Sequence, residues 1–233
     1  MRVPKVINYD TAIDKEVVSL EPICFEPKFY DLGRDKDKFK YITTIERICR
    51  SSMEYHDLIE FLRTNMGMNF CSFFHNVSRD TFNGKNRIRI EIHHEPFTLY
   101  DITAIILNNR IDTGEPTDML SVCNEVMQVH YEGIVGLLPL SQTVHQLVHS
   151  GKLFIPLQFI DEGFNEFYNR YNTTIKNMDG LSDMLAAKIR LSKEYATDPE
   201  QFISILRKKY IYVINNGYES IPGKLPITGK KNS

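Results

Sequence analysis

The chain has 233 residues, of which 42% are apolar and 25% are charged, and its formal net charge is -2 at pH 7. This length and composition are typical of a globular protein with a substantial core, and they exclude a disordered chain. The near-neutral balance excludes a uniformly basic nucleic-acid-binding protein, although it is compatible with a local basic groove.

The cysteines and the chain's apolar segments indicate the cellular compartment. The four cysteines are scattered and form no CxxC pair, so we expect free thiols in a reducing environment. The N-terminal residues lack the apolar run of a signal peptide, and no segment reaches the roughly 20 apolar residues that span a bilayer. The sequence therefore predicts a cytoplasmic protein without a membrane partner.

Residues 1–68 are predicted to form an irregular and helical N-terminal region. Residues 1 to about 40 mix short apolar runs with prolines and charged clusters, which favours irregular structure with at most one strand. Between about 43 and 65, apolar residues recur at nearly helical spacing, with a break at two serines. This pattern indicates one or two amphipathic helices.

A hairpin is predicted next. Residues 69–77 are short, aromatic and bounded by turn residues, and Asn83-Gly84 is a strong signal for a tight β-turn. We therefore expect residues 69–77 to pair antiparallel with a strand over 87–94.

The predicted strand over 87–94 alternates between apolar and polar residues. Its isoleucines alternate with Arg89 and Glu91, so one face should be buried and the other polar. His94 continues the apolar face and His93 the polar face. The strand thus ends in two adjacent histidines that point in opposite directions.

Two helices, an apolar strand and a third helix are predicted to follow. The helices cover about 97–110 and 117–130, and the apolar run at 133–140 is typical of a short buried strand. Ser141 is a plausible N-cap and Gly151 a plausible C-terminal stop, so the segment between them should be a short helix.

The rest of the chain is predicted to be helical. Residues 156–225 form a C-terminal helical region, in which Asp198-Pro199-Glu200 is typical of a helix start. Residues 226–233 form a loose tail.

Two histidine pairs are the most informative feature of the sequence. His93 and His94 end a strand, whereas His145 and His149 are four residues apart on a helix, so their imidazoles share one face and could hold one ion. The alternative is a polar stripe beside the apolar stripe of the same helix, which consists of Val144, Leu147 and Val148.

The order of these elements resembles the HNH, or His-Me finger, nuclease motif, a ββα unit that holds one divalent ion. The run PLSQTVHQLVH at 139–149 is similar to the family's form P-L-C-x-x-C-H-x-x-K-H. Ser141 and Val144 stand where zinc-stabilised members carry cysteines, so no structural zinc is expected there. The His-His pair is similar to that of the colicin-type nucleases.

The resemblance covers roughly residues 87–151 and implies the fold. We expect an α+β protein with a ββα-metal (HNH) core at 69–155, embedded in a mostly helical chain. The segment at about 96–131 would be a helical insertion between the two strands, longer than the usual loop.

The resemblance also implies the roles of individual residues. His94 would be the general base, and His93, His145 and His149 would be the ligands of one divalent ion. Three imidazoles favour Zn²⁺, Ni²⁺ or Mn²⁺ over Mg²⁺, which prefers oxygen ligands. A further pair of carboxylates, Glu91 and Glu95, could accept hydrogen bonds from these imidazoles.

The chain departs from the family pattern at Gly136, where the family usually carries an asparagine that braces the loop. The brace would come from Gln142 or Asn124, or be missing. Because adjacent strand residues point to opposite faces, the two strand histidines would share one site only if the strand twists or bulges before Pro96.

Four cations near the motif are candidates for binding substrate phosphates. They are Arg87, Arg89, Arg110 and Lys152. The alternative for each is an ordinary solvated side chain. His130, at the predicted end of the second helix, is at a position where the helix dipole favours a histidine.

The predicted function is a metal-dependent HNH-type endonuclease that hydrolyses phosphodiester bonds in DNA. One alternative is a catalytically inactive HNH-fold protein with a nucleic-acid-binding or structural role. Another is a purely structural metal site closed by all four histidines. The helical flanks could attach a protein partner, and the resemblance fits a phage origin, in which case the protein would act in the host cytoplasm.

Overall fold

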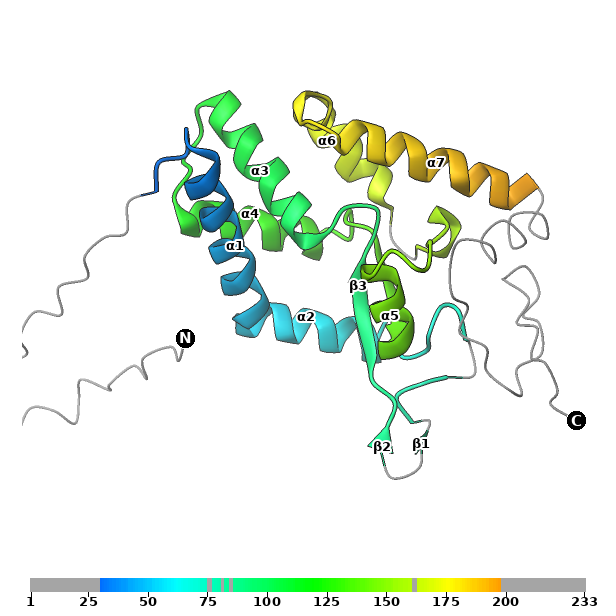
Figure 1. Cartoon of the computed structure of the whole chain (residues 1–233). Helices are drawn as coiled ribbons and strands as arrows, with labels where there is room; N and C mark the ends of the chain where they lie inside the picture. The colour runs from blue at the N-terminus through cyan, green and yellow to red at the C-terminus, as the bar shows by residue number, and fades with distance from the viewer. Residues whose placement is uncertain (1–29, 75–76, 81, 84–85, 161–162, 198–233) are drawn as a thin grey trace, which may run out of the picture.

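The structure is a computed structural model that describes residues 30–74, 77–80, 82–83, 86–160 and 163–197 (Figure 1). The predicted helix after Asp198 and the predicted tail lie outside this part of the chain, as do residues 1–29 with their possible strand.

The N-terminal region begins with two consecutive helices. Helix α1 (Asp35–Ser51) is followed at once by α2 (Met53–Thr64). The break falls at Ser52, whose side chain accepts a hydrogen bond from the backbone N–H of Tyr55 and so caps α2. The predicted break is therefore confirmed. Because α1 starts at Asp35, the prediction of irregular structure up to about residue 40 was wrong for its last six residues.

The predicted hairpin exists only as a short ribbon. Strand β1 (Phe82–Asn83) pairs antiparallel with β2 (Asn86–Arg87). The predicted pairing of residues 69–77 with the histidine-bearing strand was wrong. In the described part of that segment, Phe70 forms an isolated bridge with Ser78, and the side chains of Phe73 and Phe74 are buried in a core.

The histidine-bearing strand β3 (Ile90–His94) pairs instead with β4 (Leu137–Ser141), antiparallel and residue for residue. His93 lies opposite Leu138 and His94 lies opposite Leu137. This register contains no bulge, so of the two distortions considered for the end of the strand, a twist or a bulge, the bulge is excluded.

Two helices separate the paired strands in the sequence. They are α3 (Leu99–Thr113) and α4 (Met119–Tyr131), each capped by a side chain at its N-terminus. Helix α5 (Gln142–His149) directly follows β4, with Ser141 at its N-cap. Gly151, at φ 67°, ends this segment in the left-handed region. These helices agree with the predictions within a few residues.

The chain after α5 packs back on the strands. A 3₁₀ turn, η2 (Leu157–Phe159), leads to α6 (Phe164–Asn177) and α7 (Leu181–Thr197). In Figure 1, α1, α3 and α4 lie on one side of β3, and α7 runs above α5.

Two hydrophobic cores meet at the β3–β4 pair. The helical core contains buried residues of α1, α2, α3, α4, α6 and α7 together with Leu137 of β4. The second core, which we call the hairpin core after the β3–β4 pair, contains Leu138, Leu140 and Val144. It also contains residues from the 71–77 and 153–159 segments, and Tyr195. The helical core therefore draws on the N-terminal region, the insertion and the C-terminal region alike.

The predicted α+β class is confirmed, because the described residues contain seven α-helices and two small antiparallel sheets. None of those helices combines the length and apolar character needed to cross a membrane.

Candidate functional site

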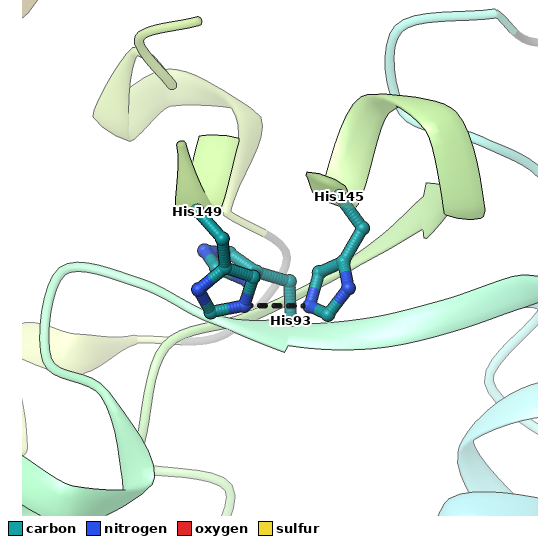
Figure 2. Close-up of side chains that lie close together, drawn as sticks. All are labelled: His93, His145 and His149. Carbon is teal, nitrogen blue, oxygen red and sulfur yellow. Dashed lines mark hydrogen bonds between the residues drawn. The ribbon is translucent and has the colours of Figure 1, made fainter. Parts of the chain in front are cut away.

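Three imidazoles converge where β3 passes α5. His93 comes from the strand, and His145 and His149 come from successive turns of the helix (Figure 2). A ligand nitrogen of each lies within 4.8 Å of one from each of the others. The Nε2 atoms of His145 and His149 are 3.0 Å apart. A strand and a helix that are far apart in the chain but packed together thus bring together residues 52 and 56 positions apart.

The separation of the two helix histidines is near that of two ligands of one tetrahedral cation. Two nitrogens bound to the same zinc at about 2.1 Å lie about 3.4 Å apart, close to the observed separation of His145 and His149. The rings meet nearly at right angles, with centroids 4.4 to 5.1 Å apart. Three protein ligands would leave a fourth position for water or substrate, as in catalytic rather than structural zinc sites.

Glu91 fixes the tautomer of His145. Its Oε2 lies 2.6 Å from Nδ1 of His145. A carboxylate can only accept, so Nδ1 carries the proton and donates it, and Nε2 presents its lone pair toward His149. Carboxylates behind metal-binding histidines orient them in this way and raise their basicity.

The helix histidines are held neutral. Burial, and after it the neighbouring His93 and His149, lowers the pKa of His145 to about 4. Burial and the nearby His93 also lower the pKa of His149. Both imidazoles therefore keep their lone pairs at neutral pH, as a metal ligand requires.

Glu95 links the site to α7. Its buried carboxylate lies 3.5 Å from Nε2 of His93 through one oxygen and contacts the Lys188 ammonium through the other. Lys188 also donates to the carbonyl oxygen of Pro96 at 2.9 Å. The end of β3 is thus tied to the C-terminal helix by a buried ion pair.

His94 points away from the three converging imidazoles, as strand alternation requires. Its Nε2 lies 2.9 Å from Nε2 of His130, which comes from the last turn of α4. Burial, followed by His130, lowers the pKa of His94 well below its usual value. Both strand histidines nevertheless line the same pocket.

Helices α1 and α2 form the opposite wall of that pocket. Arg50 and Arg63 line it together with Tyr55 and His56. Arg63 donates to the carbonyl oxygen of Ile90, which holds α2 against β3. The guanidinium of Arg50 is paired with Glu46 at the surface. Both guanidiniums thus line the pocket close to the histidines, and each is also paired with a glutamate of its own helix.

Gly136 lies where no side chain fits. A Cβ at this position would lie 1.8 Å from the carbonyl oxygen of Glu95, and the two backbones are hydrogen-bonded. Neither residue proposed as a substitute for the missing asparagine is near His94: Gln142 is exposed at the start of α5, and Asn124 lines pockets away from the histidines. Among the described residues, His130 contacts His94 instead.

Comparison with known proteins identifies the family. The family model described as Bacteriophage G278-like virion protein matches residues 5–217, nearly the whole chain. The chain belongs to this family. No curated protein and no solved structure matches it.

In this member of the virion protein family, none of the three predicted substrate-binding cations whose side chains are described lines the histidine pocket. Arg110 lies near the end of α3, about 16 Å along the helix axis from Leu99 at the pocket, and it pairs with Glu115 and Glu125. Arg89 and Lys152 are exposed beside β3 and α5. The side chain of Arg87 lies outside the described part of the chain.

Sequence reasoning missed Arg50 and the contact between His94 and His130. Arg50 had no signal, because it stands in an ordinary amphipathic helix. His130 was interpreted first as a helix-end residue, and its approach to the site was the lesser alternative. Its contact with His94 joins residues 36 positions apart, which no local pattern encodes.

Proposed function

We propose that this protein is a metal-dependent HNH-type endonuclease that hydrolyses phosphodiester bonds in DNA. The observation that carries the proposal is the convergence of His93, His145 and His149 on one point beside an antiparallel strand pair and the helix that follows it. Glu91 lies behind His145 and Glu95 behind His93, so carboxylates back two of the three imidazoles, an arrangement typical of histidines that bind a metal.

The general base in this proposal is His94. It lines the same pocket as the three ligands, and a neutral imidazole there can accept a proton from water. An attacking water gives its proton to His94 as its oxygen bonds to phosphorus. The bond from phosphorus to the 3′ oxygen then breaks, and the leaving oxygen takes up a proton from solvent.

A divalent cation bound by the three imidazoles would supply Lewis-acid stabilisation of the charge on the phosphate and on the leaving oxygen. Glu91 would keep His145 in the ligating tautomer, and Glu95 would lie behind His93. Arg50, on the opposite wall, would hold a neighbouring phosphate.

The family description supports a second candidate, a structural component of the phage particle. A virion protein could retain the three histidines to hold a structural ion between β3 and α5, without cutting DNA. In either case we propose that the helical flanks attach the protein to its neighbours in the particle.

A nicking assay separates the two functions. We expect the purified protein to relax supercoiled plasmid DNA in the presence of at least one of Mn²⁺, Ni²⁺, Zn²⁺ and Mg²⁺, and to be inactive with chelator. Plasmid that stays intact with all four ions, under conditions in which calorimetry shows one ion bound, would leave only the structural function.

Three variants test the assigned roles. His94→Ala should lower the nicking rate at least about 100-fold, the usual contribution of a general base, while the protein still binds one ion. His145→Ala and His149→Ala should weaken ion binding itself. Gln146→Ala, at an exposed position on the same helix, is the matched control and should retain both properties. Equal loss of the ion in all three histidine variants would support a structural site closed by four histidines.

A further inference from the structure

The enclosed contact between His94 and His130 has no part in holding the ion. Both side chains are almost completely buried, and their ring centroids are 5.1 Å apart with an edge-to-face arrangement. On its other side, His130 meets the edge of the Tyr55 ring at 6.0 Å. Both rings are therefore held in place by their surroundings.

The hydrogen bonds of this pair determine which nitrogens carry protons. Nδ1 of His130 lies 2.6 Å from the carbonyl oxygen of Val126. A carbonyl oxygen only accepts, so Nδ1 of His130 carries a proton. Burial lowers the pKa of His130 to about 4, so the ring is neutral at pH 7 and its Nε2 has no proton.

The position of the proton on His130 determines the position of the proton on His94. Because Nε2 of His130 has only a lone pair, the 2.9 Å contact requires Nε2 of His94 to donate. An imidazole that acts as a base carries a single proton, so with that proton on Nε2 the Nδ1 of His94 has only a lone pair. Nδ1 is thus the nitrogen of His94 that can take a proton from another molecule.

We propose that His130 is a positioning residue that holds His94 in the Nε2–H tautomer and presents Nδ1 as the basic atom. The inference rests on the proposed function, because it assigns to His94 the proton-accepting role in cleavage. His130 acts through His94 and does not touch substrate. It also supplies the brace that Gly136 cannot, since that position has no room for a side chain.

The arrangement gives the long insertion a function. Helix α4 lies between β3 and β4 in the sequence, and its last turn returns directly to β4. The helix fixes the backbone of Val126, one turn before His130. The hydrogen bonds that join the Val126 carbonyl oxygen to His130, and His130 to His94, therefore have little freedom. An orienting partner of this kind matters to a catalytic imidazole because the wrong tautomer cannot accept the proton.

The first test needs no catalysis. In metal-free protein with ¹⁵N-labelled histidine at pH 7.5, long-range ¹H–¹⁵N correlation spectra should show His94 protonated only at Nε2 and His130 only at Nδ1. A His94 ring protonated at Nδ1 would overturn the inference. If the wild type fails to nick DNA, the proposed function fails, while this spectrum still decides whether His130 sets the tautomer of His94.

The second test separates positioning from folding. His130→Leu should lower kcat about 100-fold or more, with KM and ion affinity unchanged. His130→Gln can accept from Nε2 of His94 through its amide oxygen, and it should restore most of that loss. Equal activity per folded molecule in both variants and in the wild type, with the folded fraction taken from circular dichroism, would show that His130 is only a packing residue.

Discussion

At the scale of single residues, the surroundings of Gly136 explain why no asparagine can occupy this position, as it does in the motif that the chain resembles. The position faces the carbonyl oxygen of Glu95, and the Glu95 N–H donates to the carbonyl oxygen of Gly136. The two backbones approach as closely as the hydrogen bond allows, and this approach places the end of β3 beside the turn into β4. A side chain there would separate the strands next to His94.

Gly136→Ala should therefore destabilise the protein strongly. Its Cβ would lie 1.8 Å from the Glu95 carbonyl oxygen, a backbone atom that cannot move without shifting β3. We expect a loss of about 3 kcal/mol or more in the free energy of unfolding, at the upper end of the range for overpacking. Urea unfolding followed by circular dichroism measures it.

The control for this substitution is Gly163→Ala, at a position with a negative φ and no heavy atom within 4 Å of the added Cβ. Its cost should stay below about 1 kcal/mol, since it alters only a helix N-cap. Similar costs for the two substitutions would contradict the close approach at Gly136. Restoring the motif's residue with Gly136→Asn should destabilise the protein as well and should not improve cleavage.

At the scale of elements, local signals predicted the helices, and nonlocal pairing was predicted less well. Helix α5 was predicted because a serine cap, an apolar stripe and a glycine stop all lie within the short segment from Ser141 to Gly151. The partner of β3 depends on a contact across α3 and α4, so the Asn-Gly turn gave the wrong pairing with residues 69–77. The resemblance to a ββα unit, which depends on element order, indicated β4 as its partner, and this pairing is confirmed.

The last turn of α1 contributes the charge that faces the histidines. Arg50 lines the pocket, and its charge adds to burial and neighbouring imidazoles in lowering the pKa of His94 and His149. A guanidinium in that place can contact a phosphate beside the scissile bond. The sequence did not predict this wall of the pocket, because a cation near a helix end is common. The direction in which the Arg50 side chain points depends on the break between α1 and α2 at Ser52.

Arg50→Ala should weaken DNA binding about tenfold at moderate salt, because one phosphate contact is lost. The slope of log Kd against log salt concentration should fall by about 1. Fluorescence anisotropy with a labelled duplex measures both quantities, and it does so with chelator present, so that cleavage does not interfere. Arg47→Ala removes the same charge from an exposed position of α1 outside the pocket and is the matched control. An equal effect of the two substitutions would mean that only the net charge matters.

At the scale of the whole molecule, β3 connects the two cores. His93 lies opposite Leu138 of the hairpin core, whereas His94 lies opposite Leu137 of the helical core. His93 therefore lies beside the two histidines of α5, whereas His94 contacts His130 of α4. The convergence of His93, His145 and His149 was predicted from the resemblance to the ββα motif, which depends on the order of the elements. The partner of His94 was not, because it depends on how the helical core packs.

The buried histidines should make the metal-free protein sensitive to acid. The pKa of His130 is lowered by burial from 6.5 to about 4 in the folded state. Between these values the unfolded chain binds a proton that the folded chain does not, so stability falls as the pH falls. One pKa unit corresponds to about 1.4 kcal/mol, so His130 alone should remove about 3 kcal/mol between pH 6.5 and pH 4.

Urea unfolding at pH 7 and pH 4.5, with chelator present, tests this expectation. The wild type should lose about 2 to 3 kcal/mol more than His130→Gln over this interval, because glutamine does not titrate. Gln146→Ala, exposed on α5, should lose as much as the wild type. Carboxylates that titrate over the same interval are common to all three proteins and cancel in the comparison. An equal loss in the wild type and in His130→Gln would mean that His130 takes up its proton without unfolding, which the buried contact with His94 does not allow.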